Sequence, residues 1–397
     1  METKTIFFSS LDSILNGRSL LKQGNTVDPH STYIQNYVQV CNYVSSVNKS
    51  ELPVLRKAPA HWDEYQKSLI DAKAASIKWV NEIAANLKEL PTELMDSNED
   101  VLDLFQKAID HCDKLIIDPT DEFARKKLKQ DINNSLEEIH DLSQKIERVI
   151  QRMSEFRDTL PQQAANLQHI ADLAMQDEKV DKDKIEELQK KIGEIKSEIS
   201  SLTGAIVGLS IALGASIILS VVAVAVAGPI GMLTWIFTGA AAAVATTYIV
   251  IDSIKLNTLK QEVKALQHDM DDYTADVATL QVVAKTFQEL AEQAIAVEDN
   301  MKYILDIWKA LDYDLTQISK EIEKSGEKYS SQDWAGVKTG FQNATTLWKQ
   351  FQEEVKLCSL EEMSGNTAKL DIGMSSEEVK QQLDAGKNVE LIEYLTA

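Results

Sequence analysis

The chain has 397 residues, a formal net charge of −21, and only 15 glycines and 7 prolines. Glycine stands at roughly half of its average share and proline at roughly a third, which argues against a β-rich or α/β fold and favours long helices. The acidity argues against nucleic acid as a partner, because a nucleic-acid binder needs clustered lysines and arginines. Attraction to anionic lipid by bulk charge is equally unfavourable.

The first 60 residues predict an irregular start, because they contain Pro29, Pro53 and Pro59. Residues 1–12 hold no apolar run long enough for a Sec-type signal peptide. If the protein is exported, we therefore expect it to leave the cell without such a signal.

Two helices are predicted next along the chain. The first spans residues 61–90 and is expected to end at Pro91. The second spans residues 99–117. The following sequence, Asp-Pro-Thr-Asp at 118–121, is typical of a turn and cap that begin another helix.

An apolar repeat with spacings of three and four residues then predicts a long helix that packs like a coiled coil. Pro161 is expected to kink or break this helix. The repeat consists of Ile132, Leu136, Ile139, Leu142, Ile146, Val149, Met153, Phe156 and Leu160.

A more regular repeat occupies residues 256–322 and predicts a helix about 100 Å long. Helices are also predicted at residues 331–357 and, shorter, at 375–383. The fold class is all-α: an elongated antiparallel helical bundle with an apolar helical-hairpin head. The predicted domains are an N-terminal segment 1–30, a bundle 31–198 and 252–357, a head 199–251, and a C-terminal segment 358–397.

The predicted head is a block of 53 residues, 199–251, without a charged side chain. It divides into apolar segments 203–227 and 230–251, joined by a turn at Gly228 and Pro229. As a helix, each segment is long enough to cross about 30 Å of hydrocarbon. The strong hydrophobes of the first segment favour insertion by about 4 to 7 kcal/mol in total.

The candidate membrane-inserting residues are Ile206, Val207, Leu209, Ile211, Leu213, Ile217, Ile218, Leu219, Val221, Val222, Val224, Val226, Leu233, Trp235, Ile236, Phe237, Val244, Ile249, Val250 and Ile251. Small residues at a spacing of four predict close helix packing within the membrane. These residues are Gly204, Gly208, Ser210 and Gly214.

Three interpretations of the block remain open. It is a permanent membrane hairpin, a buried core hairpin that never meets lipid, or a segment that a soluble protein inserts conditionally. The long, charged and regular flanking helices favour conditional insertion, because a simple anchor does not need them.

No motif of an enzyme or cofactor site is present, including the P-loop, the dinucleotide fingerprint, HExxH and the EF-hand loop. The six histidines are scattered singly, and Cys41, Cys112 and Cys358 are too far apart for a zinc site. We predict buried free thiols, no catalytic residues, no metal and no cofactor.

A bundle of long helices interrupted by an apolar hairpin resembles the cytolysin A type of α-pore-forming toxins. This superfamily includes the haemolysin BL and non-haemolytic enterotoxin components of Bacillus and the tripartite toxins of Gram-negative bacteria. The resemblance covers roughly residues 31–357 and rests mainly on the position of residues 202–251 between two heptad helices.

The resemblance implies a secreted toxin that is soluble as a monomer, inserts its hairpin into a target-cell membrane and assembles into an oligomeric pore. Two full-length spans are most similar to the membrane-spanning component of a multi-part toxin. The implied partners are the lipid membrane and further copies or partner components. The alternative is a membrane-anchored coiled-coil scaffold or a membrane-remodelling protein.

Overall fold

The computed structural model describes residues 29–50, 52, 62–174, 186, 190, 194, 217–219, 221–223, 236–238, 247–249, 265, 272–361, 363–366 and 374–390. Its helices are α2 (Pro29–Lys49), α3 (Trp62–Lys78), the π-helix η1 (Trp79–Ala84), α4 (Ala85–Asp96), α5 (Asn98–Ile117), α6 (Glu122–Ala174), α9 (Asp272–Ser330), α10 (Trp334–Lys356) and α11 (Ser376–Ala385). Its strands are β1 (Ile217–Leu219), β2 (Val221–Ala223), β3 (Ile236–Thr238), β4 (Thr247–Ile249), β5 (Ser364–Asn366) and β6 (Asn388–Glu390).

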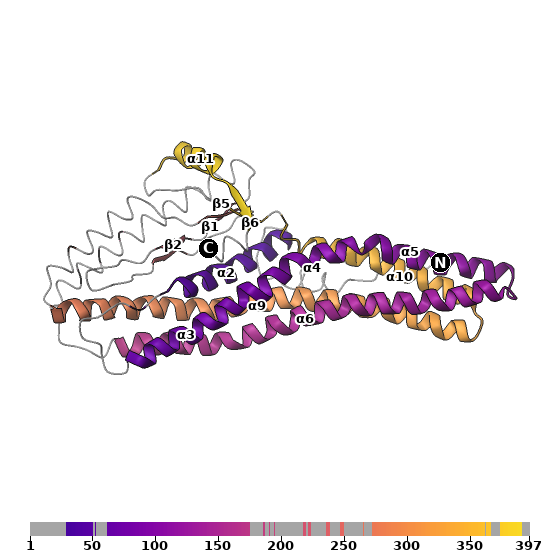
Figure 1. Ribbon diagram of the computed structural model, residues 1–397, viewed down its shortest axis with the longest axis horizontal. Helices are drawn as coiled ribbons and strands as arrows, with labels where there is room; N and C mark the ends of the chain where they lie inside the picture. Colours follow the sequence, from indigo (N-terminus) through magenta and orange to yellow (C-terminus); the bar gives the residue numbers. More distant parts are fainter. Residues whose placement is uncertain are drawn as a thin grey trace, which may run out of the picture. The chain divides into compact units, whose positions relative to one another are not determined.

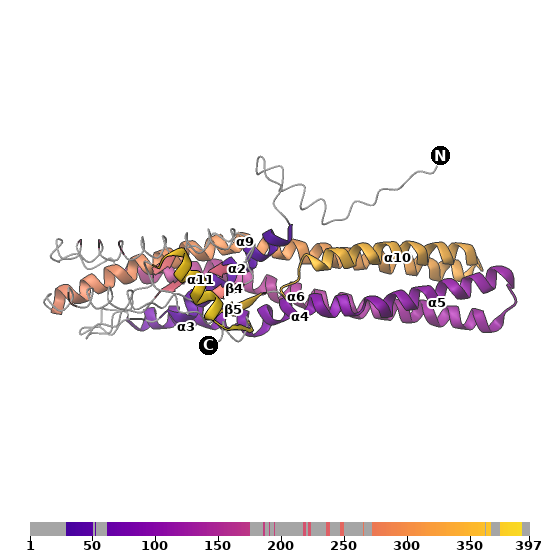
Figure 2. The ribbon, with the colours of Figure 1, turned by 90° about the horizontal axis from the view of Figure 1, so that it is seen from above.

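The chain forms two compact units, and the long helices contribute to both. Unit 1 comprises Met1–Tyr33, Ala85–Ser154 and Tyr303–Glu361, and unit 2 comprises Ile34–Ala84, Glu155–Lys302 and Glu362–Ala397. The prediction of a helical bundle is confirmed (Figures 1 and 2).

Unit 1 is a bundle built from α4, α5, α10 and parts of α6 and α9. The turn between α5 and α6 forms as predicted. The Asp118 carboxylate accepts hydrogen bonds from the Thr120 backbone N–H at 3.0 Å and from its hydroxyl at 2.6 Å. Asp121 accepts from the Ala124 N–H at 2.9 Å, which satisfies a donor in the first turn of α6. This short turn makes α5 and α6 antiparallel neighbours.

Within unit 1, α10 packs against α5. The rings of Phe105 on α5 and Phe341 on α10 lie edge to face with centroids 5.8 Å apart. The Trp348 indole N–H donates to Asn98 Oδ1 at 3.0 Å, so this large side chain is buried without losing its hydrogen bond. Aromatic packing and satisfied polar groups therefore hold α10 against α5.

The predicted apolar repeats form the core of the described bundle. In α9 every position of the predicted repeat from Leu280 onward is buried: Leu280, Ala284, Phe287, Leu290, Ala294, Val297, Met301, Ile304, Trp308, Leu311, Leu315, Ile318 and Ile322. In α6 the repeat differs at one point: Ser135 is fully buried, whereas Leu136 is half-buried. A small side chain in the interface lets neighbouring helices approach more closely. The spacing of apolar residues along the sequence does not predict this kind of packing.

Unit 2 has its own aromatic core. Trp79, at the start of the π-helix η1, lies 4.9 Å from the Phe156 ring and 6.3 Å from the Tyr37 ring, measured between centroids. The Tyr43 hydroxyl donates to Gln163 Oε1 at 2.8 Å. These contacts join α2, η1 and the last part of α6.

Two predictions about prolines are wrong, and a third is wrong in part. Pro29 begins α2, because the first helical position needs no N–H donor. Pro91 lies inside α4 and is buried, so tertiary packing outweighs the one backbone hydrogen bond that it removes. Of the two effects predicted for Pro161, a kink or a break, the break is wrong, because α6 continues through this residue. It is exposed, so water can satisfy the carbonyl that loses its N–H partner.

The prediction of buried free thiols is confirmed for Cys41, Cys112 and Cys358. Burial raises the pKa of the Cys41 and Cys112 thiols from 9.0 to about 12. The pKa of Cys358 is raised further, again mainly by burial. Ionisation of these thiols therefore opposes folding, and their contribution to stability is present below pH 9 and lost as the pH rises towards their folded pKa values.

We expect the folded protein to resist thiol reagents at pH 8 because all three thiols are buried and protonated. Labelling counted by mass spectrometry should show no modification in native buffer and three modifications in denaturant. Rapid labelling of the native protein would contradict the packing around these thiols.

The close contact of α9 with α10 generates a second prediction. A Cβ on Gly340 would overlap Ser325 Oγ and lie 3.1 Å from the Glu321 carbonyl oxygen, whereas one on Gly326 would meet only Ile132 Cγ2 at 3.9 Å. Gly340→Ala should lower the free energy of unfolding by about 1 to 3 kcal/mol in urea titrations. Gly326→Ala, the matched control, should raise it by up to about 1 kcal/mol, because alanine favours a helix. Equal effects would contradict the contact.

Candidate functional site

The candidate site is the uncharged block. Eight of the predicted membrane-inserting residues are described, all in strands: Ile217, Ile218, Leu219, Val221, Val222, Ile236, Phe237 and Ile249. The others lie outside the described residues: Ile206, Val207, Leu209, Ile211, Leu213, Val224, Val226, Leu233, Trp235, Val244, Val250 and Ile251. The predicted turn and packing residues also lie outside: Gly228, Pro229, Gly204, Gly208, Ser210 and Gly214.

The prediction of a helical conformation is wrong for the parts of the block that form β1 to β4. Most residues of these strands are β-branched or aromatic, as in Ile-Phe-Thr of β3 and Thr-Tyr-Ile of β4. Such residues favour strands over helices when packing permits. Within the described part of the chain, no helix combines the length and apolar character needed to cross a bilayer.

The strands of the block pair with one another in two ways. β2 and β3 are antiparallel, with Val222 opposite Phe237. β1 and β4 are parallel, with Ile218 opposite Tyr248. These pairings satisfy backbone N–H and C=O groups that the apolar side chains cannot satisfy.

The C-terminal part of unit 2 extends the sheet that contains β4. The strand order is β1-β4-β5-β6. β5 runs parallel to β4, with Thr247 opposite Ser364 and Tyr248 opposite Gly365. β6 pairs antiparallel with β5, with Gly365 opposite Val389. We call β5, α11 and β6 the C-terminal clasp.

The clasp pairs polar residues with one edge of β4, the Thr-Tyr-Ile strand of the block. β5 is Ser-Gly-Asn and β6 is Asn-Val-Glu. Between them, α11 begins with a capping box, in which Ser375 and Glu378 satisfy each other's backbone N–H groups. Without the clasp, β4 would present an open edge that invites pairing with other chains.

Sequence reasoning did not find the clasp strands. The short helix predicted at residues 375–383 is confirmed by α11, and the spacing of Ser375 and Glu378 is that of a capping box. β5 contains no β-branched or aromatic residue, and β6 contains only Val389, so neither three-residue run is long enough to predict a strand. Their conformation depends on β4, which lies more than 100 residues earlier in the chain.

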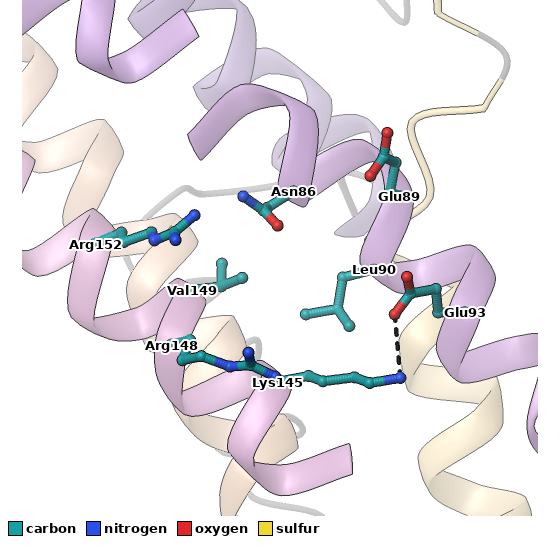
Figure 3. Close-up of a pocket in the computed structure, with 8 residues that line it drawn as sticks. All are labelled: Asn86, Glu89, Leu90, Glu93, Lys145, Arg148, Val149 and Arg152. Atoms are coloured by element: carbon teal, nitrogen blue, oxygen red, sulfur yellow. Dashed lines mark ion pairs between the residues drawn. The ribbon is translucent and has the colours of Figure 1, made fainter. Parts of the chain in front are cut away.

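A small cavity in unit 1 between α4 and α6 has a volume of about 230 Å³ and is lined by Asn86, Glu89, Leu90, Glu93, Lys145, Arg148, Val149 and Arg152. Figure 3 shows Leu90 and Val149 at its centre and Lys145 extended towards Glu93, with Nζ 3.3 Å from a carboxylate oxygen. Both partners of this ion pair are about half exposed, so it contributes little to stability. The volume is below that of usual ligand pockets.

The described histidines have separate surroundings. His111 Nδ1 lies 2.7 Å from Asp131 Oδ2, and His30 Nδ1 donates to the Leu357 carbonyl at 3.0 Å. Among the residues that the structure describes, no three His, Cys, Asp or Glu side chains are placed to hold a metal ion. His61 and His268 lie outside these residues.

No model of a protein family matches the chain, and no curated protein matches its sequence. Among solved structures, the chain is similar to soluble SmhB of the tripartite α-pore-forming toxin Smh from Serratia marcescens. The identity is 14% and the TM-score 0.43, and the match covers 90% of this chain and 96% of SmhB.

Two further solved structures have comparable similarity. The HblL1 toxin component of Bacillus cereus matches at 13% identity and a TM-score of 0.42, over 84% of this chain and 95% of its own. Soluble AhlB of the tripartite toxin AHL from Aeromonas hydrophila matches at 15% identity and a TM-score of 0.41, over 90% and 98%. All three are toxin components, and SmhB and AhlB belong to tripartite α-pore-forming toxins.

Proposed function

We propose that this protein is a component of an α-pore-forming toxin. It folds as a soluble monomer, reaches its target from outside the cell and inserts the block 199–251 into the target membrane, where protomers assemble into a pore. The observation that carries the proposal is the pairing of one strand of this apolar block, β4, with strand β5 of the polar C-terminal clasp. A segment rich enough in apolar residues for lipid is thereby paired with a segment suited to water.

The length and composition of the block support insertion. Residues 203–227 and 230–251 each suffice for one crossing as a helix, and neither contains a charge. Two crossings return the chain to the side from which it entered, so both flanking helices remain on one side of the membrane. Insertion converts the strands into helices, because a helix satisfies its own backbone hydrogen bonds in hydrocarbon.

The shortness of the strands supports release. Each of β1 to β4 has three residues, and β4 pairs with the clasp through two register positions. Each lost backbone hydrogen bond costs only about 0.5 to 1.5 kcal/mol net in water. Burial of the first apolar segment in lipid is favourable by more than a few such bonds.

A conducting pore also needs a polar lining, which aliphatic side chains do not provide. The block contains hydroxyl side chains that can face a lumen: Ser210, Ser216, Ser220, Thr234, Thr238, Thr246 and Thr247. Amphipathic helices of a partner component would supply a more polar lining. We therefore propose that this chain acts with partner components and spans the membrane for them.

Dye release from liposomes and red cells tests the function. The purified protein should release dye, alone or mixed with similar helical proteins encoded by neighbouring genes, whereas a variant lacking residues 203–251 should not. Circular dichroism of the bundle provides the folding control for the deletion. Absence of leakage in every mixture, or equal leakage from the deletion variant, would refute pore formation.

A disulfide between β4 and the clasp tests release. Register partners on neighbouring strands lie about 4.8 Å apart, within the range that a disulfide spans. Oxidised Thr247→Cys/Ser364→Cys should therefore lose most of its dye release, and reduction should restore it. The native cysteines are buried and do not compete.

The matched control is Gly365→Cys/Val389→Cys, which links β5 to β6 and leaves β4 free. Its oxidised form should release dye like its reduced form. Equal release by oxidised and reduced Thr247→Cys/Ser364→Cys would show that β4 does not leave the clasp, even if the wild type forms pores.

A further inference from the structure

A second apolar surface lies in unit 1, at the turn between α5 and α6. Ile116 is 47% exposed, Ile117 85% and Phe123 66%. Their neighbours Leu115 and Ala124 are fully buried. At the start of α6 a small alanine therefore points inward while the large phenylalanine points outward, the reverse of what core packing favours.

Basic side chains accompany these apolar residues. Residues 114–129 carry five basic and three acidic side chains, in a chain whose net charge is −21. Lys114, Lys126 and Lys129 are exposed. Within the described part of the chain, none of the ion pairs involves these three lysines. We call Lys114, Ile116, Ile117, Phe123, Lys126 and Lys129 the α5–α6 tip.

The acidic groups beside the tip are engaged within the turn itself. Asp118 accepts two hydrogen bonds from Thr120, and Asp121 caps α6. Glu122 pairs with Arg125 at 3.1 Å. These bonds hold the carboxylates against the backbone and a neighbouring cation, so the lysines are left to interact with an external anion.

The connection between α9 and α10 lies at the same end of unit 1 (Figures 1 and 2). Its charged groups are Glu327, Lys328 and Asp333. Asp333 accepts from the Gly336 N–H at 2.9 Å, and Lys328 Nζ donates to the Gly336 carbonyl at 3.4 Å. Of the two acidic groups of this connection, Asp333 caps α10, whereas Glu327 is exposed and does not.

The apolar and basic side chains of the tip share helix faces. Lys126 follows Phe123 by three residues, and Ile117 follows Lys114 by three, so the members of each pair lie on one side of their helix. In each pair the apolar residue is nearer the turn and the lysine is one helical turn further back. A surface that meets this end therefore first encounters hydrocarbon side chains and then ammonium groups.

We propose that the α5–α6 tip docks on an anionic lipid surface, separately from the block 199–251. Isoleucine and phenylalanine side chains at a turn can enter the boundary between headgroups and acyl chains, and lysines one turn back can reach lipid phosphates. The charge arrangement selects an anionic bilayer over a neutral one. Docking does not require pore formation, because the tip lies in unit 1 and the block in unit 2.

A fluorophore at the tip tests this proposal. Thr120 is exposed, and Thr120→Cys keeps the backbone N–H that donates to Asp118, although it loses the hydroxyl bond. Because the native thiols are buried, this cysteine can be labelled selectively with an environment-sensitive dye. The full chain should show a blue-shifted emission with phosphatidylcholine vesicles containing about 30% phosphatidylserine, and little shift with phosphatidylcholine alone. About 1 M salt should reduce the shift because it screens exposed charges.

Variants separate the two parts of the tip. In the labelled background, Lys126→Glu/Lys129→Glu should weaken vesicle binding by at least about tenfold, since each lysine near an anionic surface contributes about 1 kcal/mol. Ile117→Ser/Phe123→Ser should abolish the blue shift. The charge-matched control is Lys309→Glu/Lys349→Glu, and the apolar control is Ile70→Ser/Ile77→Ser, all at exposed positions. Both controls should behave like the parent.

No emission change on anionic vesicles, or equal losses in tip and control variants, would overturn lipid docking. A change in sedimentation of the tip variants without vesicles would assign the tip to a protein contact instead and also overturn it. Dye release measured in parallel separates the proposals. Release without the emission change refutes tip docking alone, and the emission change without release in any mixture refutes pore formation alone.

Discussion

The backbone of the uncharged block needs hydrogen-bond partners in any surroundings, and this requirement governs the structure around it. In water, the described parts of the block meet it by pairing as strands with one another and with the C-terminal clasp. In lipid, the same residues would meet it as helices, because a helix satisfies its own backbone groups. Two conformations of one segment can therefore satisfy the same groups in two solvents.

The helical packing provides a contrast to this sheet. In unit 1, Gly340 leaves no room for a methyl group beside α9, and the buried Trp308 indole N–H still donates to the Tyr33 hydroxyl at 3.0 Å. Unit 2 packs Trp79 between Tyr37 and Phe156. Well-packed helices with satisfied polar groups resist rearrangement, whereas three-residue strands with few hydrogen bonds do not.

The helices were largely predictable from the sequence because their information is local. The apolar repeat from Leu280 to Ile322 predicts which face of α9 is buried. The turn residues Asp118 and Asp121 predict where α6 begins. Prolines were misjudged where tertiary packing or exposure compensates the lost hydrogen bond, as at Pro91 and Pro161. The exposure of the tip residues Ile117 and Phe123 could not be predicted from the spacing of apolar residues. It depends on which side chains the neighbouring helices cover in the folded protein.

The sequence by itself determined that the chain is a helical bundle carrying one long uncharged apolar segment, because apolar spacing and the absence of charge are properties of consecutive residues. Only the tertiary structure decided the conformation of the described parts of that segment and its partner. β4 pairs with β5, which has no strand signal of its own, and backbone pairing between segments more than 100 residues apart leaves no trace in local composition. The pairing of the Ser-Gly-Asn strand β5 with the Thr-Tyr-Ile strand β4 is therefore a consequence of the fold, not of propensity.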